Sequence, residues 1–182
     1  MGKKVCGTGH RTSKFTWYDW NKSDFENELH PECLAIKKAI KEQLIMLINN
    51  GYDYFITGMA LGFDTWLAES VIDLKKDYPF IQLEAAVPCL YQDTKWTEEQ
   101  QKRYKNILNA CDIIHYVSKA PYDKFCMNKR NYYMVDNSDM VIACYDGSAG
   151  GTRNAYLYAI NNHVNIININ PKTKKIEYID NR

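Results

Sequence analysis

The sequence lacks the motifs that identify the common nucleotide-using and hydrolytic enzymes. It has no GxxxxGK[ST] phosphate loop, and its first glycines do not complete a GxGxxG dinucleotide fingerprint because position 12 is Thr12. The GxSxG elbow of serine hydrolases and the HExxH zinc motif are also missing. These absences count against P-loop hydrolysis, ordinary NAD binding, serine hydrolysis and zinc proteolysis.

Net charge and long apolar runs are also scarce. The 23 lysines and arginines balance 22 aspartates and glutamates, so no global field predicts binding to DNA or to an anionic membrane. No apolar run reaches the roughly 18 residues that a membrane helix needs, and the N-terminus has no apolar signal core. We therefore expect a soluble, cytoplasmic protein without a membrane partner.

Paired cysteines and clustered histidines are missing as well. The six cysteines form no CxxC unit and several lie in apolar stretches, which favours reduced, buried thiols over disulfides. The four histidines are far apart in the chain: His10, His30, His115 and His163. We accordingly expect no metal site and no bound cofactor.

What is present is an alternation of strands and helices typical of one globular domain over residues 1–182. Apolar stretches predict strands at residues 3–6, 52–57, 80–87, 112–117, 139–145 and 164–168, with an edge strand at 176–179. Helical periodicity predicts helices at 31–50, 67–74, 98–110, 124–137 and 152–161. This order indicates a Rossmann-like three-layer α/β/α sandwich with a mainly parallel sheet.

One connection in this pattern is unusually long. Residues 12–30 are polar and aromatic, and include Trp17, Tyr18 and Trp20. Long connections in compact domains are often lids or binding loops. Two interpretations stay open: a surface loop whose aromatic side chains staple it to the core, or a segment whose aromatic rings stack on a ligand.

Three short glycine-bearing stretches each follow a predicted strand. They are Gly7-Thr8-Gly9-His10-Arg11, the stretch Gly58–Asp64 that includes Gly62, and the stretch Asp146–Thr152 that includes Gly147, Gly150 and Gly151. Glycine lets the backbone approach a ligand closely, and the first turn of a following helix offers N–H groups to an anion. Because the carboxyl ends of parallel strands share one edge of a sheet, the three stretches predict a common phosphate site.

Several side chains in or near these stretches are candidate ligands. Arg11 can hold a phosphate at two points or pair with a neighbouring acid, and His10 can donate to a ligand or be structural. Asp64 can cap a helix or accept from a ribose hydroxyl, and Thr152 can cap a helix while touching phosphate. Further donors come from the segment that holds Asn128, Arg130 and Asn131, unless this face is only solvated.

The combination resembles the YpsA-like family of the SLOG superfamily, which also contains the DNA-processing protein DprA and the cytokinin-activating LOG enzymes. The resemblance rests on TGHR after the first strand, TGMALGFDTWLAE after the second and SDMVIACYDGSAGGTRNA near the end of the chain. It implies a Rossmann-like fold that binds nucleotides or nucleotide-derived ligands. The first stretch matches at Gly7 and Arg11, the second at Gly58, Gly62 and Asp64, and the last at Gly150, Gly151 and Thr152.

One departure separates this chain from the LOG enzymes, which cleave the N-glycosidic bond of a nucleoside monophosphate with a PGGxGTxxE motif. The glutamate of that motif falls on Ala155, and no proline precedes the loop. Two interpretations of Glu69 stay open: an acid that substitutes for the missing glutamate, or a surface residue. The resemblance therefore favours a binding, sensory or regulatory role for a nucleotide-like ligand, with a homodimer as the expected assembly. A nucleotide-processing enzyme such as a phosphoribohydrolase, and a less favoured DNA-associated protein, are the alternatives.

Overall fold

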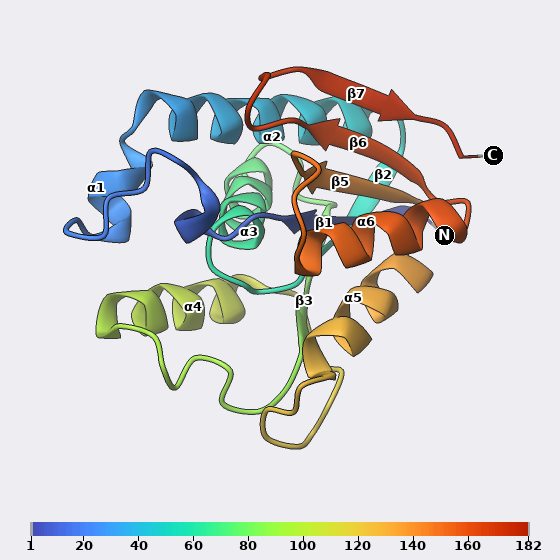
Figure 1. The fold of residues 1–182 in the computed structure, drawn as a ribbon. Coiled ribbons are helices and arrows are strands. Elements are labelled where there is room, and N and C mark those ends of the chain that lie inside the picture. Colours follow the sequence, from blue (N-terminus) through green and yellow to red (C-terminus); the bar gives the residue numbers. More distant parts are fainter. Residues whose placement is uncertain (1, 182) are drawn as a thin grey trace.

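A computed structural model describes residues 2–181 of the chain. Strands and helices alternate along most of it (Figure 1). The strands are β1 Lys3–Gly9, β2 Tyr52–Thr57, β3 Gln82–Val87, β4 Ile113–Tyr116, β5 Met140–Cys144, β6 Asn165–Ile169 and β7 Ile176–Ile179. The helices are α1 Asp24–Glu28, α2 Pro31–Asn49, α3 Phe63–Leu74, α4 Glu98–Ala110, α5 Cys126–Asp136, α6 Gly151–Asn161 and the short 3-10 helix η1 Thr12–Lys14.

The strands form one sheet in the order β4-β3-β2-β1-β5-β6-β7, and only β7 is antiparallel to its neighbour. Helices α2, α3 and α4 cover one face, while α5 and α6 cover the other (Figure 1). The predicted three-layer α/β sandwich with a mainly parallel sheet is therefore confirmed.

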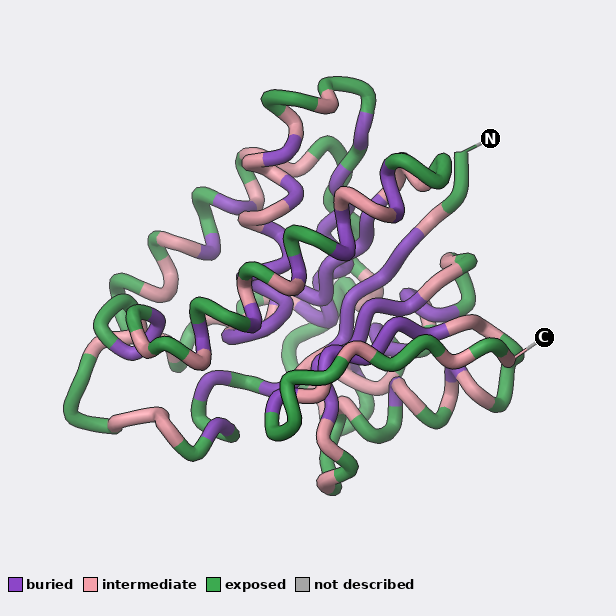
Figure 2. Tube along the Cα trace, turned by 90° about the horizontal axis from the view of Figure 1, so that it is seen from above, coloured by how far each residue is buried: buried purple, intermediate pink, exposed green. Residues whose placement is uncertain are grey.

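Alternate side chains of each central strand enter two separate cores. Val5 and Phe55 pack under α2 and α3, whereas the next residues, Cys6 and Ile56, pack under α5 and α6. Figure 2 shows the buried strands at the centre of the molecule. A strand buried on both faces needs apolar residues at every position, which explains why these strands read as continuous apolar stretches.

Strand β1 extends further than the sequence predicts. Residues 3–6 were expected, but the strand continues through Gly7, Thr8 and Gly9, which pair with β5 at Ile142, Ala143 and Cys144. Pairing with β5 keeps these glycine residues in the strand, although a propensity-based prediction excludes them. The first glycine stretch is thus the end of a strand, and the true loop begins at His10.

The long connection of residues 12–30 is also more ordered than a loop. It contains η1 and α1, and Ser23 caps α1 through a capping box with Glu26. Trp17 stacks between Phe15 (5.0 Å) and His30 (5.3 Å), so both faces of its ring are covered. Trp17 therefore anchors the segment to the core, and the interpretation that its ring stacks on a ligand is wrong for this residue.

The strand order reverses at β1, and this reversal positions the site. From β1 the chain builds the sheet in one direction through β2, β3 and β4, and then returns to add β5 on the other side of β1. The connections that leave β1 and β5 diverge to opposite faces of the sheet. An open space at the carboxyl ends of these two strands is where ligands collect in α/β sheets.

Candidate functional site

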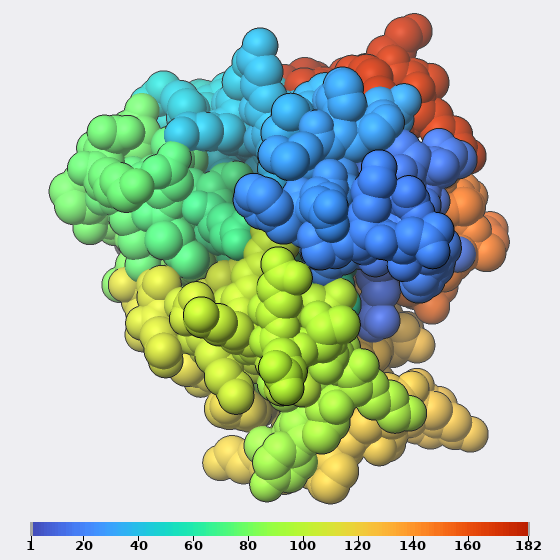
Figure 3. All heavy atoms as spheres, turned by 90° about the vertical axis from the view of Figure 1, so that its left-hand side faces the viewer, coloured from blue at the N-terminus to red at the C-terminus, as the bar shows by residue number. Residues whose placement is uncertain are grey.

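A groove of about 340 Å³ lies at the carboxyl ends of β1 and β5. We call it the rim groove. Its wall consists of Thr8, Gly9, His10, Arg11, Ser13, Lys14, Ala60, Asp64, Met127, Arg130, Asn131, Ser148, Ala149, Gly150, Gly151 and Thr152. Figure 3 looks toward this end of the molecule, where the blue N-terminal segment lies near the gold and orange segments that contain α5 and α6. All three glycine-bearing stretches thus contribute to one cavity of the size that small ligands occupy.

A buried ion pair forms the floor of the rim groove. Arg130 Nη1 donates to Asp64 Oδ2 at 2.9 Å, and both side chains are less than a tenth exposed. The same carboxylate oxygen accepts from the backbone N–H of Ala60 at 3.2 Å. Burial raises the pKa of Asp64, and the Arg130 charge holds back part of that rise.

One of the two sequence-based interpretations was that Asp64 caps α3. The structure shows that it does not. The N-cap is Gly62, at φ 88°, and no side chain caps this helix end. A Cβ at Gly62 would lie 2.7 Å from the backbone nitrogen of Thr12, so this glycine permits close approach of two chain segments. Asp64, one residue into the first turn, instead reaches back across the loop to Ala60 and Arg130.

Arg130 retains unused hydrogen-bonding capacity. Its Nε is buried and has no hydrogen-bond partner among residues 2–181. Room for its guanidinium comes from Gly58, where a Cβ would lie 1.2 Å from Arg130 Nη1. Buried donors in proteins are almost always paired, so an unpaired one on a cavity wall indicates a place for an acceptor.

His10 is held beside the rim groove by a second carboxylate. Its Nε2 lies 2.9 Å from Asp146 Oδ1, and Lys172 Nζ lies 2.8 Å from Asp146 Oδ2. The backbone N–H of Ser148 also donates to Asp146 at 3.0 Å. Burial raises the pKa of Asp146, but hydrogen bonds from Lys172, Ser148 and His10 outweigh burial, and the net shift is downward.

The first turn of α6 faces the rim groove with its backbone exposed. Gly150 is the N-cap, at φ 146°, and no side chain caps this end of the helix. Thr152 is therefore not the cap that the sequence suggested, because the helix already begins at Gly151. The side chain of Asn131 steadies the turn by donating to the Gly151 carbonyl at 3.3 Å. The N–H groups of an uncapped first turn suit an anion.

Some predicted site residues lie outside the groove wall. Gly7 faces the Leu67 side chain, Gly58 and Gly62 provide room for Arg130 and the Thr12 backbone, and Gly147 turns the chain at φ 91°. Asn128, half-buried on α5, does not line the groove; Met127, Arg130 and Asn131 do. One turn of helix separates Met127 from Arg130, so only part of the polar face meets the cavity.

The sequence motifs did not include Lys14, and they placed Asp146 in the third glycine-bearing stretch without assigning it a role in binding. Lys14 ends η1, a turn that the sequence pattern did not reveal, and its side chain reaches the groove wall. Asp146 stands just before Gly147, where an acidic residue reads as ordinary turn chemistry. Its contact with His10 spans 136 positions in sequence and could not be found from local spacing.

Glu69 does not supply a substitute acid to the groove. Both of its carboxylate oxygens accept from Arg103, at 2.6 and 2.7 Å, and Arg103 also binds Glu28. Ala155 is buried on α6, with 1% exposure. The one carboxylate on the groove wall is that of Asp64, among the residues that the structure describes.

The described residues contain neither a cluster of metal-ligating side chains nor a membrane-spanning helix. Within residues 2–181 no group of three or more histidine, cysteine, aspartate or glutamate side chains is placed to hold a metal ion. No helix in this part of the chain is long and apolar enough to cross a membrane.

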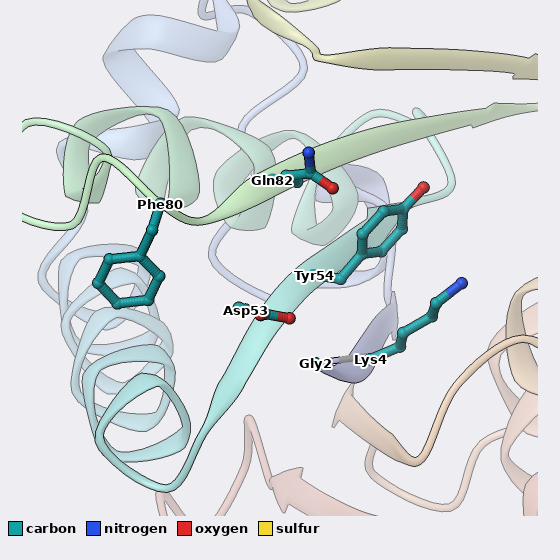
Figure 4. Close-up of a pocket in the computed structure, with 6 residues that line it drawn as sticks. All are labelled: Gly2, Lys4, Asp53, Tyr54, Phe80 and Gln82. Atoms are coloured by element: carbon teal, nitrogen blue, oxygen red, sulfur yellow. The ribbon is translucent and has the colours of Figure 1, made fainter.

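A second pocket, of about 190 Å³, lies at the opposite edge of the sheet (Figure 4). It is lined by residues at the amino ends of β1, β2 and β3, including Lys4, Asp53 and Phe80. The Lys4 ammonium lies 4.6 Å from the centre of the Tyr54 ring. None of the predicted site residues lies there, and this edge is the one away from the strand-order reversal.

Comparison with known proteins connects this geometry to a family. Residues 6–179 match the model of the YspA SLOG family. A UPF0398 protein of Halalkalibacterium halodurans is 37% identical over 156 residues, covering 85% of this chain and 78% of the relative. The SPbeta prophage-derived protein YoqJ of Bacillus subtilis is 37% identical over 142 residues, covering 71% of this chain and 83% of the relative.

Solved structures of DNA processing protein A share the fold. The protein from Helicobacter pylori, which has a single-stranded DNA binding mode, superposes with a TM-score of 0.57 at 20% identity. The protein from Streptococcus pneumoniae gives a TM-score of 0.58 at 15% identity. Each match covers 92% of this chain, but only 65% and 50% of the respective solved chains.

Proposed function

Because the chain belongs to the YspA SLOG family, we propose that the rim groove binds the phosphate-bearing part of a nucleotide-like ligand, in a sensory or regulatory role. The observation that carries the proposal is the charge of the groove wall. Arg11, Lys14 and Arg130 face a single carboxylate, that of Asp64, beside the uncapped first turn of α6. This arrangement attracts an anion.

Each part of the wall has a distinct task in the proposal. The exposed guanidinium of Arg11 makes two-point contact with phosphate oxygens, and the first-turn N–H groups of α6 donate to the same group. Buried Arg130, fixed by Asp64, supplies an additional donor through its free Nε. The second oxygen of the Asp64 carboxylate accepts from a ribose hydroxyl.

Binding is favoured over cleavage by the acids of the site. A glycosidase-type reaction needs a carboxyl group free to exchange a proton with the substrate. Glu69 is occupied by Arg103 away from the groove, position 155 is alanine, and the Asp64 carboxylate is held by Arg130 and the Ala60 N–H. Chromatography of nucleoside monophosphates incubated with the protein should accordingly show no released base.

The binding test is calorimetry with AMP, ADP, UDP and GMP, compared with the parent nucleosides. We expect a phosphorylated compound to bind and its nucleoside to bind at least tenfold more weakly. Arg11→Met should raise the Kd about 10- to 100-fold, because a hydrogen bond to a charged group contributes about 1.5–3 kcal/mol. Lys38→Met, at an exposed lysine on α2, is the matched control and should leave the Kd unchanged.

Two results would contradict the proposal. One is that nucleosides bind as well as their phosphates and that Arg11→Met has no effect. The other is salt-dependent binding to single-stranded DNA that no mononucleotide competes for, which would support the DNA-associated alternative.

A further inference from the structure

A smaller cavity of about 180 Å³ adjoins the rim groove. We call it the Trp17 pocket. The two cavities share His10 and Lys14, and the wall of the Trp17 pocket is completed by Phe15, Trp17, Asp146 and Lys172, among others. The smaller cavity lies below the roughly 300–1,000 Å³ that drug-sized ligands occupy, so it suits one fragment of a larger molecule.

Each of the two cavities has one wall residue with an unpaired buried polar atom. Only two buried side-chain nitrogen or oxygen atoms of residues 2–181 lack a hydrogen-bond partner: Arg130 Nε and Trp17 Nε1. Arg130 lines the rim groove, and Trp17 lines the Trp17 pocket. An indole nitrogen can only donate, so each cavity has one wall residue with a buried donor that no protein acceptor satisfies.

Neighbouring rings pack against the Trp17 side chain, and its Nε1 is the one part that lacks a hydrogen-bond partner. Phe15 and His30 cover its two faces with interplanar angles of 15° and 7°. Phe15 in turn packs against buried Trp66 at 5.6 Å. A ligand group in the pocket therefore contacts aromatic edges and meets a fixed donor, not a stacking platform.

Apart from Lys14, which the two cavities share, the charged residues of the Trp17 pocket are paired. Asp146 is paired with Lys172 and His10, and Glu32 is paired with Lys174 at 2.9 Å. A second anion gains little attraction there. A neutral group with hydroxyl oxygens fits better, because hydroxyls accept from Trp17 Nε1 and donate to the carboxylates.

We propose that the ligand is a two-part nucleotide: its phosphates occupy the rim groove, and a neutral, hydroxyl-rich group esterified to the last phosphate, such as a sugar, enters the Trp17 pocket. The inference rests on the proposed function, since it needs phosphate in the rim groove. It adds the class of compound: a nucleoside diphosphate conjugate rather than a free mononucleotide. Lys14, on the shared wall, neutralises the linking phosphate.

The test is calorimetry with matched pairs: UDP and UDP-glucose, ADP and ADP-ribose, GDP and GDP-mannose. We expect at least one conjugate to bind about tenfold more tightly than its parent diphosphate. Trp17→Phe removes the Nε1 donor and keeps the aromatic stack, so it should weaken the conjugate about tenfold and leave the diphosphate unchanged. Trp20→Phe, in the same segment but 77% exposed, is the control and should change neither.

The outcomes separate the two proposals. Equal binding of every conjugate and its parent, or a Trp17→Phe effect that is absent or the same for both, overturns the two-part ligand while phosphate binding stands. Failure of all six compounds to bind overturns the two-part ligand, and failure of AMP and GMP as well overturns both proposals. A thermal melt of each variant shows whether it is folded. Retained affinity of Trp17→Phe for the diphosphate is a second check, because an unfolded protein would lose that affinity as well.

Discussion

At the scale of single residues, the glycines around the rim groove have two separate tasks. Gly9 and Gly58 make room for side chains: a Cβ at Gly9 would lie 2.3 Å from the Phe63 ring, and one at Gly58 would meet Arg130. A Cβ at Gly150 or Gly151 would meet nothing within 4 Å. The first pair keeps the site packed, and the second pair keeps it open.

This difference predicts opposite results for two alanine substitutions. Gly9→Ala forces the fully buried Phe63 to move and should lower the free energy of unfolding by about 2–3 kcal/mol, as overpacking does. For a chain of this length, that loss corresponds to roughly 5–10 °C in Tm. Gly151→Ala, at the first position of α6, should change stability by less than about 1 kcal/mol. Equal melting temperatures for the two variants would contradict this assignment.

The sequence predicted the members of the Asp64–Arg130 pair, but not the pair itself. Both residues were candidates for ligand binding on the strength of their positions after strands or on a polar helix face. Their contact joins α3 to α5 across 66 positions and depends on a glycine at position 58. No local pattern reveals such a contact, because only the crossover connections bring the two helices to one edge of the sheet.

At the scale of elements, a buried charged cluster ties α1, α2, α3 and α4 together. Glu28 accepts from Trp66 Nε1 at 2.8 Å and from Arg103 Nη1 at 2.6 Å, and it pairs with Lys37 at 2.5 Å. Burial raises the pKa of Glu28, but these partners outweigh burial and lower it overall. The cluster fixes α1, which lies at the far end of residues 12–30, the connection that carries Trp17.

The cluster predicts a specific dependence of stability on pH. A carboxyl whose pKa is lower in the folded than in the unfolded state stabilises fully above its unfolded pKa, about 4.5 for Glu28. That contribution is lost as pH falls from about 4.5 through the lower folded pKa. Glu28→Gln should therefore cost about 3 kcal/mol at pH 7 and show a shallower loss of stability below pH 4.5, measured by urea unfolding. Glu42→Gln, at an exposed glutamate, is the control; a wild-type-like acid profile in Glu28→Gln would contradict the prediction.

The elements themselves were largely predictable, whereas their ends were not. Continuous apolar stretches located the parallel strands because both faces of the sheet are covered. The end of β1 and the helices within residues 12–30 were missed, since pairing with β5 and burial against α2 to α4 override local propensity.

At the scale of the whole molecule, most of the thiols are buried, three of them in the two cores on either side of the sheet. Five of the six cysteines are buried, and only Cys111 is partly exposed. Burial raises the pKa of Cys6, Cys33 and Cys111 to about 12. Reduced thiols in such surroundings are poor nucleophiles because so little thiolate forms.

This predicts slow labelling of the folded protein by a thiol reagent at pH 8. Mass spectrometry should show at most one modified cysteine, Cys111, while unfolding in guanidinium should expose all six. Cys111→Ser should remove the residual reaction. Rapid labelling of several cysteines in the native protein would show that one of the cores opens.

Cytoplasmic location and homodimerisation stay predictions.

The shared grip of Arg103 on Glu28 and Glu69 has a consequence for how the chain can vary. A lineage that lost the acid at position 28 would leave Arg103 with Glu69 as its remaining carboxylate partner and would remove the acceptor of Trp66 Nε1. Natural variation at these positions should therefore be correlated. No residue of α4 lines either cavity, but a change in α4 at Arg103 would reach the Trp17 pocket through the anchored end of residues 12–30.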